Sequence, residues 1–283
     1  MLDAVATSAT DAPGLSGKVA LVTGGGGGIG AGVSRRLAAA GAQVVLLDID
    51  RVRAEQTRDG IRCLGGRAHA VIGDVCDRSV VNQFVAAGAE IGGGRIDILV
   101  NNVGDYRPWG PFVDSDEHAW ELMHDINFRH VLRCTKAVLP TMLAQSSGSI
   151  VNVTTVEALR ADPTEAVYSG YKAAVMAFTR SLAVEVASKG IRVNAIAPDM
   201  TATLQIPAEE MLAGRPESDI AMWVPLGRFG QPEDSADVVV FLAGDGSRFV
   251  TGITIPVDGG TLAAGGWYRR ASGDGWTVTP DRP

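Results

Sequence analysis

Short apolar runs alternate along this chain with longer segments whose apolar residues recur with a helical period. The first run, KVALVTG, spans residues 18–24 and precedes a helical pattern from Ile29 to Ala40. Strands that are apolar on both faces and separated by helices indicate parallel βαβ units. The same pattern places further strands at residues 42–48, 67–73, 96–102, 149–155, 191–197 and 252–260, and further helices at residues 52–64, 79–91, 117–144, 165–188 and 233–243.

The predicted strands follow one another without a hydrophobic gap or a linker rich in proline and serine. A length of 283 residues would allow about two domains of typical size, but one uninterrupted series favours a single domain. We therefore predict an α/β fold with a Rossmann-like, doubly wound, seven-stranded parallel sheet over residues 17–262. Residues 1–16 are expected to form a disordered N-terminal tail, and residues 263–283 a C-terminal extension.

Two regions depart from the alternation. Residues 200–224 contain Pro207, Pro216 and several acidic residues, and they are too many for a tight turn. Long segments of this kind in compact domains are often lids, so we predict one here. The extension contains Trp267 and Trp276, and exposed tryptophan is unfavourable in a soluble monomer. We therefore expect the extension to pack on a neighbouring subunit or to close its pocket.

Composition and charge narrow the possible partners. Apolar residues make up 46% of the chain, which excludes bulk disorder, and a net charge of −7 argues against a nucleic-acid partner. No run approaches the roughly 18 uncharged apolar residues of a membrane span, and the N-terminus does not resemble a secretory signal. Three cysteines are too few for a disulfide framework, and the four histidines show no metal-binding spacing. We expect a cytoplasmic protein without a metal site or a membrane partner.

A glycine run directly after the first strand is the first candidate for chemistry. Gly24 to Gly28 are continuous and Gly30 follows, at the start of a predicted helix. Such a turn lets the backbone approach a pyrophosphate, although a glycine run alone also fits a merely flexible turn. Asp48 ends the second strand 18 positions beyond Gly30, close to the roughly 20-residue offset of an acid that binds a ribose hydroxyl. The pattern predicts NAD as cofactor. Arg51 and Arg53 leave NADP open as the less favoured choice.

Several motifs in order resemble those of the short-chain dehydrogenase/reductases, over about residues 17–262. They are Thr23-Gly24-xxx-Gly28-Ile29-Gly30, Gly73-Asp74-Val75, Asn101-Asn102-Val103-Gly104, Asn127, Tyr168-x-x-x-Lys172, Pro225-Leu226-Gly227-Arg228 and Asp258-Gly259-Gly260. The resemblance implies a nicotinamide cofactor bound by Gly24, Gly28, Ile29, Gly30, Asp48, Asp74, Val75, Asn101, Tyr168, Lys172, Thr201 and Thr203. It also implies a homotetramer in which the two long helices, residues 117–144 and 165–188, pair across an interface.

Tyr168 and Lys172 lie four positions apart on a predicted helix, so their side chains share one face. A neighbouring ammonium favours a phenolate, and we therefore expect Lys172 to lower the pKa of Tyr168 toward the working pH. Tyr168 would then exchange a proton with an alcohol or a carbonyl oxygen. On its own, the spacing also fits an ordinary pair on a helix surface. The resemblance adds that Lys172 bonds the nicotinamide ribose.

Two further residues, Thr155 and Asn127, are expected to be catalytic, and each also fits a role without chemistry. Thr155 stands where relatives typically carry the serine that orients the substrate; it keeps a hydroxyl, but it also fits an ordinary strand residue. Asn127 matches a residue to which the resemblance assigns a proton relay through water to Lys172, although an asparagine in a helix is often simply solvated. Asp199 replaces a usual glycine after Pro198, with an effect on the lid that the sequence leaves open.

These observations predict an NAD-dependent oxidoreductase that moves a hydride between nicotinamide and a secondary alcohol or ketone, cyclic or of medium chain length. The residues expected to face this small-molecule substrate are Asp105, Tyr106, Trp109, Glu157, Leu159, Arg160, Leu204, Ile206, Met211 and Trp223. The alternative is an NAD-binding regulatory protein that kept the fold with weak or no turnover. The Thr155 and Asp199 departures favour this alternative, whereas retention of Tyr168 and Lys172 argues against it.

Overall fold

The structure is a computed structural model that describes residues 14–270 and 272–277. Its main sheet has the strand order β3-β2-β1-β4-β5-β6-β7, and every neighbouring pair is parallel. The predicted doubly wound, seven-stranded sheet is thereby confirmed. The strands are β1 (Val19–Thr23), β2 (Gln43–Asp48), β3 (Arg67–Ile72), β4 (Ile98–Asn101), β5 (Gly148–Val153), β6 (Ile191–Pro198) and β7 (Thr254–Val257).

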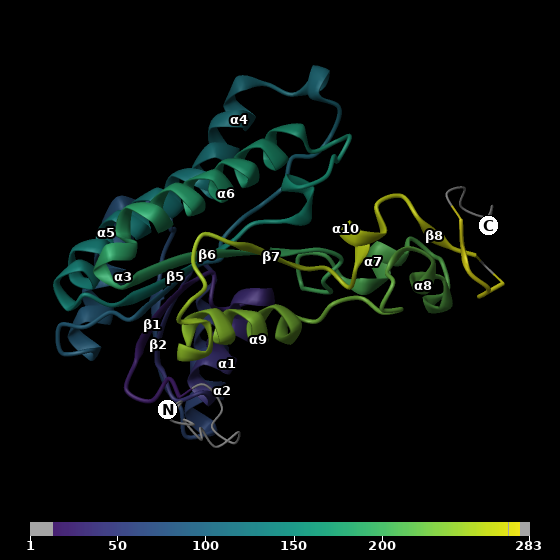
Figure 1. Cartoon of the computed structure of the whole chain (residues 1–283). Helices are drawn as coiled ribbons and strands as arrows, with labels where there is room; N and C mark the ends of the chain where they lie inside the picture. The colour runs from purple at the N-terminus through teal and green to yellow at the C-terminus, as the bar shows by residue number, and fades with distance from the viewer. Residues whose placement is uncertain (1–13, 271, 278–283) are drawn as a thin grey trace, which may run out of the picture.

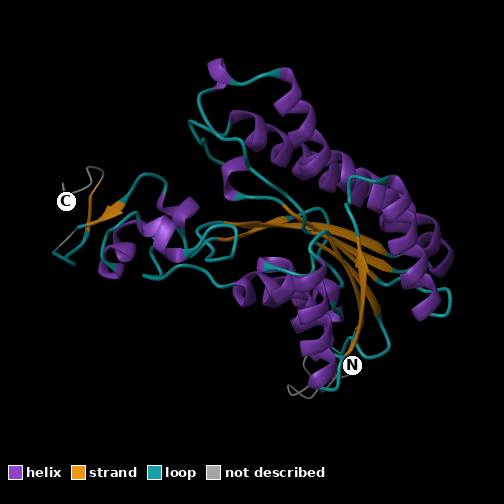
Figure 2. Ribbon diagram, turned by 180° about the vertical axis from the view of Figure 1, so that it is seen from behind, coloured by secondary structure: helices purple, strands orange, loops and turns teal. Residues whose placement is uncertain are grey.

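Helices cover both faces of the sheet, because successive side chains of a strand point to opposite faces and both sets are apolar here. In β1, Ala20 and Val22 pack into one core cluster, whereas Val19 and Leu21 pack into the other. Figures 1 and 2 show the resulting three layers. The first cluster lies under α1 (Gly28–Ala39), α2 (Arg51–Cys63) and α9 (Pro232–Ala243); the second lies under α3 (Arg78–Ile91), α5 (His130–Gln145) and α6 (Ala166–Val186).

The sheet positions a binding crevice through its strand order. From β1 the chain winds outward to β2 and β3, and it then returns to place β4 on the other side of β1. In open parallel sheets, ligands bind at this reversal, beyond the carboxyl ends of the strands. The segments that follow Thr23 and Asn101 therefore lie at the crevice.

The helix expected over residues 117–144 is interrupted by a wider turn. Helix α4 (Glu117–His124) continues into a π-helical turn, η2 (Asp125–Arg129), and then into α5. A π turn holds one residue more than a regular turn and often marks a functional site. Here the turn contains Asn127, whose side chain is completely buried.

The expected lid contains short helices of its own. These are α7 (Ala208–Leu212), a 3₁₀ turn η5 (Glu217–Asp219) and α8 (Ile220–Trp223), which share a small apolar cluster around Ile220, Val224 and Phe229. Further 3₁₀ turns are η1 (Phe112–Asp114), η3 (Val156–Ala158), η4 (Ala187–Lys189) and η6 (Asp245–Ser247). The cluster makes the lid a small packed unit rather than an unstructured loop.

The C-terminal extension folds back on the lid of its own chain. After α10 (Thr261–Ala264), strand β8 (Tyr268–Arg269) pairs antiparallel with β9 (Trp276–Thr277), and β8 lies beside α8 (Figure 1). Trp267 remains half exposed. Packing of the extension on a neighbouring subunit therefore stays a prediction.

Most of the expected N-terminal tail, residues 1–13, lies outside the described residues. Leu15 is buried in the first core cluster, and its backbone N–H donates to the carbonyl oxygen of Ala40 at 3.0 Å. The packed part of the chain thus begins before residue 17, since an apolar side chain at position 15 reaches the core. Among the described residues, no helix is long and apolar enough to cross a membrane.

Candidate active site

A cleft of about 980 Å³ opens at the carboxyl ends of the strands. Its walls come from the glycine turn, the ends of β2 and β3, the segments after β4 and β5, α6 and the lid. It gathers most of the site residues expected from sequence: Gly24, Gly28, Ile29, Asp48, Asp74, Val75, Thr155, Tyr168, Lys172, Thr201 and Thr203. Three expected site residues, Gly30, Asn101 and Asn127, do not line it.

The glycine turn lets α1 approach the end of β1 more closely than side chains would allow. A Cβ atom at Gly30 would lie 2.0 Å from the carbonyl oxygen of Gly24, and one at Gly26 would lie 2.8 Å from the backbone nitrogen of Ala54. Gly24 also has φ of +64°, in the left-handed region. Gly30 therefore shapes the turn by packing beneath it rather than by facing the cleft.

Asp48 joins the end of β2 to this turn. Its Oδ2 accepts a hydrogen bond from the backbone N–H of Gly26 at 2.9 Å, and its Oδ1 accepts one from Asp50 at the same distance. The carboxylate is thus fixed at the edge of the cleft. Arg53 also lines the cleft, but its guanidinium forms an ion pair with Asp50 at 3.2 Å.

Asn101 lies in the core, and its expected contact with a cofactor is not supported. Its side chain is 1% exposed, and Nδ2 donates to Oδ1 of Asn152 at 2.8 Å and to the hydroxyl of Thr135 at 3.2 Å. Because Asn101 is the last residue of β4, its side chain points into the protein. The next residue, Asn102, lines the cleft, and its Nδ2 donates to the carbonyl oxygen of Thr23 at 3.1 Å.

Asn127 holds the loop that follows β4. Its Oδ1 accepts from the backbone N–H of Asp105 at 3.1 Å, and its Nδ2 donates to the carbonyl oxygen of Asp105 at 2.7 Å. A Cβ atom at Gly104 would lie 3.0 Å from Oδ1 of Asn127 and 2.5 Å from Nζ of Lys172. Asn127 and Lys172 therefore both border the backbone at Gly104. No direct bond between their side chains occurs among the described residues.

Tyr168 and Lys172 lie one turn apart on α6, as expected. Lys172 is 3% exposed, its Nζ donates to the carbonyl oxygen of Val153 at 3.2 Å, and it lies 5.7 Å from the centre of the Tyr168 ring. Burial lowers the pKa of Lys172 to about 8, because a low-dielectric surrounding disfavours the ammonium.

The pKa of Tyr168 is raised, whereas the sequence suggested that Lys172 would lower it. Burial is the main cause, and the negative charges of Glu165, Glu157 and Asp105 add to it. A hydrogen bond with Thr155 acts in the opposite direction. Lys172 lies against the Tyr168 ring. The desolvation that lowers the pKa of Lys172 also disfavours a negative charge on the Tyr168 phenol. The protein alone therefore keeps Tyr168 as a phenol.

Thr155 belongs to a chain of hydrogen bonds along the substrate end of the cleft. Its hydroxyl donates to Oε2 of Glu157 at 2.7 Å, and Oε1 of Glu157 pairs with Arg160 at 2.8 Å. Arg160 also pairs with Oδ2 of Asp199 at 2.9 Å, and that oxygen accepts from the hydroxyl of Thr261 at 2.5 Å. This chain reaches from the catalytic segment to the start of the C-terminal extension.

The chain of bonds explains how an aspartate fits where a glycine was expected. Asp199 does not take a positive φ; the next residue, Met200, does, with φ of 38°. The backbone N–H of Met200 donates to Oδ1 of Asp199 at 2.8 Å. The side chain of Asp199 thus supports the strained backbone at the start of the lid.

The substrate end of the cleft differs in part from the expected set. Asp105, Tyr106, Trp109, Glu157, Arg160, Leu204, Ile206 and Met211 line it, but Leu159 and Trp223 do not. Trp223 packs in the lid cluster instead. No sequence motif pointed to Glu165, which lines the cleft and whose pKa burial raises to about 7. Only its position three residues before Tyr168 could have drawn attention to it. No metal-binding group of side chains occurs among the described residues.

The sequence and the fold of this chain are similar to those of known proteins. Residues 24–261 match the family model described as enoyl-(acyl carrier protein) reductase. The chain is 37% identical to the 3-oxoacyl-(acyl-carrier-protein) reductase FabG of Thermotoga maritima, over 88% of this chain and 99% of that protein. It is 39% identical to the cis-4-hydroxycyclohexanecarboxylate dehydrogenase of Sinomonas cyclohexanicum, over 87% and 97%. A solved structure described as a short chain dehydrogenase/reductase family protein superposes with a TM-score of 0.78 at 38% identity, over 88% of this chain and 99% of that one.

Proposed function

Because this chain belongs to the short-chain dehydrogenase/reductase family of oxidoreductases, we propose that it transfers a hydride between NAD and a secondary alcohol or ketone. The observation that carries the proposal is the meeting of Thr155, Tyr168 and Lys172 with the glycine turn in one cleft. Residues 17–262 are proposed as the catalytic domain.

The glycine turn and the cleft fit a dinucleotide. The close approach at Gly30 and Gly26 leaves backbone rather than side chains facing the cleft, at the start of the 12-residue helix α1. A helix N-terminus attracts phosphate groups. We assign the cofactor contacts to Gly24, Gly28, Ile29, Asp48, Asp74, Val75, Thr201 and Thr203, all of which line the cleft. The nicotinamide supplies or accepts the hydride when it is bound.

Side chains of the protein transfer the proton that the substrate oxygen loses or gains. Tyr168 takes the proton of an alcohol hydroxyl during oxidation and donates one to a carbonyl oxygen during reduction. Thr155 orients the oxygen of the substrate, and Lys172 provides a positive charge beside Tyr168. Asn127 holds the loop after β4 through Asp105, and we assign it a place in the proton path through water to Lys172.

NAD is proposed over NADP because of Asp48. Its carboxylate, fixed at the cleft edge by two backbone N–H groups, would repel a 2′-phosphate. Arg53 is the positive group of this part of the cleft, and Asp50 already compensates its charge. This balance of charges favours the ribose hydroxyls of NAD over the 2′-phosphate of NADP.

The substrate is proposed to be a cyclic or medium-chain secondary alcohol or ketone. Aromatic and aliphatic side chains, among them Tyr106, Trp109, Leu204 and Met211, surround the substrate end of the cleft. A relative named for a hydroxycyclohexanecarboxylate is consistent with a ring-shaped substrate. We further propose a cytoplasmic enzyme.

A substrate panel tests the proposal. We expect NADH formation with at least one cyclic secondary alcohol, and a loss of about 10³-fold in kcat for Tyr168→Phe, within the usual range for general acid–base catalysis. Tyr171→Phe is the matched control, because Tyr171 lies on the same helix outside the cleft lining and packs against His124. Binding of NAD with no turnover of any alcohol or ketone would support the regulatory alternative instead.

A homotetramer is proposed through the long helices. Leu122 on α4, Leu143 on α5 and Val184 on α6 are exposed, the last at 82%. Covering such apolar side chains favours association. Light scattering after size-exclusion chromatography measures the mass, and Val184→Asp is expected to shift it toward smaller species.

A further inference from the structure

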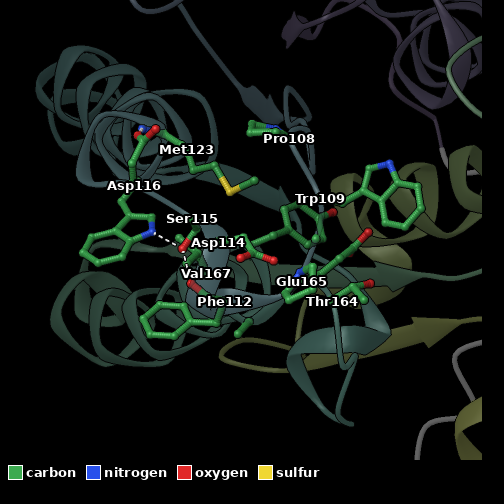
Figure 3. Close-up of a pocket in the computed structure, with 16 residues that line it drawn as sticks. Pro108, Trp109, Phe112, Asp114, Ser115, Asp116, Met123, Thr164, Glu165 and Val167 are labelled. Atoms are coloured by element: carbon green, nitrogen blue, oxygen red, sulfur yellow. Dashed lines mark hydrogen bonds between the residues drawn. The ribbon is translucent and has the colours of Figure 1, made fainter.

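A second cavity lies beside the cleft, between the loop after β4, the start of α4 and the start of α6. Its volume of about 380 Å³ lies within the range of small-molecule sites. We call it the aromatic pocket, and Figure 3 shows its lining. The 16 residues are Pro108, Trp109, Gly110, Pro111, Phe112, Asp114, Ser115, Asp116, Ala119, Trp120, Met123, Thr164, Glu165, Ala166, Val167 and Tyr168.

The aromatic pocket adjoins the reacting groups. Trp109, Glu165 and Tyr168 line both this pocket and the cleft. A substrate whose alcohol carbon lies at Tyr168 can therefore extend a substituent past Trp109 and Glu165 into the pocket. The mechanism proposed above assigns no role to the part of the pocket beyond Trp109 and Tyr168.

Hydrogen bonds and stacking hold the apolar wall in place. The rings of Phe112 and Trp120 are stacked, with centres 5.5 Å apart and planes at 6°. The indole Nε1 of Trp120 donates to the hydroxyl of Ser115 at 2.8 Å, and that hydroxyl donates to the carbonyl oxygen of Phe112 at 2.7 Å (Figure 3). The wall is thus formed before a ligand binds, which lowers the cost of binding.

All charged residues of the pocket lining are acidic. They are Asp114, Asp116 and Glu165, and no lysine, arginine or histidine lines it. Asp116 accepts from the backbone N–H of Ala119 and caps α4. Arg107, a cation in the adjoining loop, is paired with Asp105 at 2.8 Å.

Glu165 is the carboxylate whose charge is left without compensation. It is partly buried where the two cavities meet, and its side chain forms no ion pair or hydrogen bond among the described residues. The charged groups that act on it most, Asp162 and Glu157, are also acidic. A cation placed here would gain a partner, and the ring of Trp109, which lines both cavities, would add apolar contact for the group that bears it. An anion would meet no cationic side chain in the lining.

We propose that the aromatic pocket is a second substrate subsite, which binds an apolar group bearing a protonated amine. The inference rests on the proposed function and names its substrate class, amino-substituted secondary alcohols and the matching ketones. It also separates this chain from the relative named for a carboxylate substrate.

Binding of fragments without a reactive alcohol tests the subsite independently of turnover. Calorimetric titration at pH 8 with cyclohexylmethylamine, cyclohexanecarboxamide and cyclohexanecarboxylate compares three charges on one ring. We expect the amine to bind at least tenfold more tightly than the carboxylate, with the amide between them. Equal affinities, or tighter binding of the carboxylate, would overturn the proposal.

Three variants test which side chain causes the preference for the amine. Glu165→Gln is expected to weaken amine binding about tenfold and to remove most of the discrimination against the carboxylate. Trp109→Ala is expected to weaken amine and amide together. Glu117→Gln, an equal charge change on an exposed part of α4 outside the lining, should leave all three affinities unchanged. A Glu165→Gln protein that still prefers the amine tenfold would refute the assigned role of Glu165.

Measurements of turnover form the second part of the test. With 4-(aminomethyl)cyclohexanol and 4-hydroxycyclohexanecarboxylate as substrates, kcat/KM should favour the amine at least tenfold. No turnover of either, combined with tight amine binding, would refute the proposed oxidoreductase activity and leave the subsite standing. Turnover of both without discrimination would refute the subsite alone.

Discussion

The hydroxyl of Thr155 donates to the carboxylate of Glu157 across 2.7 Å, so the hydroxyl that faces Tyr168 has a fixed acceptor within its own segment. Arg160 holds Glu157 in turn. Hydrogen bonds to a charged group contribute more than neutral ones, so this contact sets the direction of the Thr155 proton. The orientation of the hydroxyl that we propose to hold the substrate oxygen thus depends on Glu157, a residue outside the matched motif.

We expect Glu157→Ala to lower kcat about tenfold, with a smaller change in KM, because loss of one charge-assisted hydrogen bond is worth roughly 1.5 to 3 kcal/mol. Glu157→Gln keeps an acceptor and should recover part of the rate. Steady-state kinetics of both variants measure the split. Glu185→Gln, an exposed carboxylate change on α6, is the control, and an alanine variant as fast as the parent would show that Thr155 is held otherwise.

The pH dependence of stability should report Lys172. Its pKa falls from 10.5 to about 8, so between these values the folded chain binds fewer protons than the unfolded chain. The free energy of unfolding therefore rises with pH across this window, and the full penalty is present below pH 8. In Lys172→Met the rise should shrink by about 3 kcal/mol, at 1.36 kcal/mol per pKa unit.

Urea unfolding at pH 7, 8, 9 and 10 measures that rise. Lys136→Met is the matched control, because Lys136 is exposed on α5. A rise of equal size in the parent and in Lys172→Met would assign the pH dependence to other groups.

Cofactor preference should respond to Asp48. Removing its charge in Asp48→Asn is expected to improve the affinity for NADP relative to NAD about tenfold, or roughly 1.4 kcal/mol of relieved repulsion. Asp59→Asn removes an exposed carboxylate on α2 that does not line the cleft, and it should leave the ratio unchanged. Fluorescence titration with NADH and NADPH gives both affinities. An unchanged ratio in Asp48→Asn would contradict the proposed basis for NAD.

Two truncations separate the parts of the C-terminal extension. A chain ending at Ala264 loses the β8–β9 hairpin beside α8, and we expect a KM several-fold higher because the lid loses a packing partner. A chain ending at Gly260 also loses Thr261, whose hydroxyl bonds Asp199, and kcat should fall as well. Mass measurements on both chains test whether the extension joins subunits. Parent-like kinetics and mass in both would exclude either role.

Periodicity was enough to predict the sheet and its helices, because β-branched apolar runs and helical periods arise from local burial. The helical spacing placed Tyr168 and Lys172 on one face, and the resemblance to the short-chain dehydrogenase/reductases implied that Thr155 joins them; the three residues do line one cleft. Asn101 was misplaced because consecutive residues at the end of a strand face opposite sides, and the motif alone does not say which asparagine faces the cleft.

Other features required three-dimensional information. The bond between Arg160 and Asp199 joins residues 39 positions apart on different strand ends, so no spacing rule predicts it. The raised pKa of Tyr168 was missed because a pairwise argument considered the charge of Lys172 without the desolvation of both groups. Whether the charge of Glu165 is compensated likewise depends on which cations the fold brings near it, and the sequence does not show this.

The π turn at Asp125–Arg129 sets a fixed rotational offset between α4 and α5. One residue more than a regular turn shifts every later side chain by about 100° around the axis. Deleting a single residue there would leave a continuous helix, yet the face that α4 presents to the aromatic pocket and the face that α5 presents to the sheet could not both be kept. The one extra residue thus lets a single helical run present one face to the aromatic pocket and a differently placed face to the sheet.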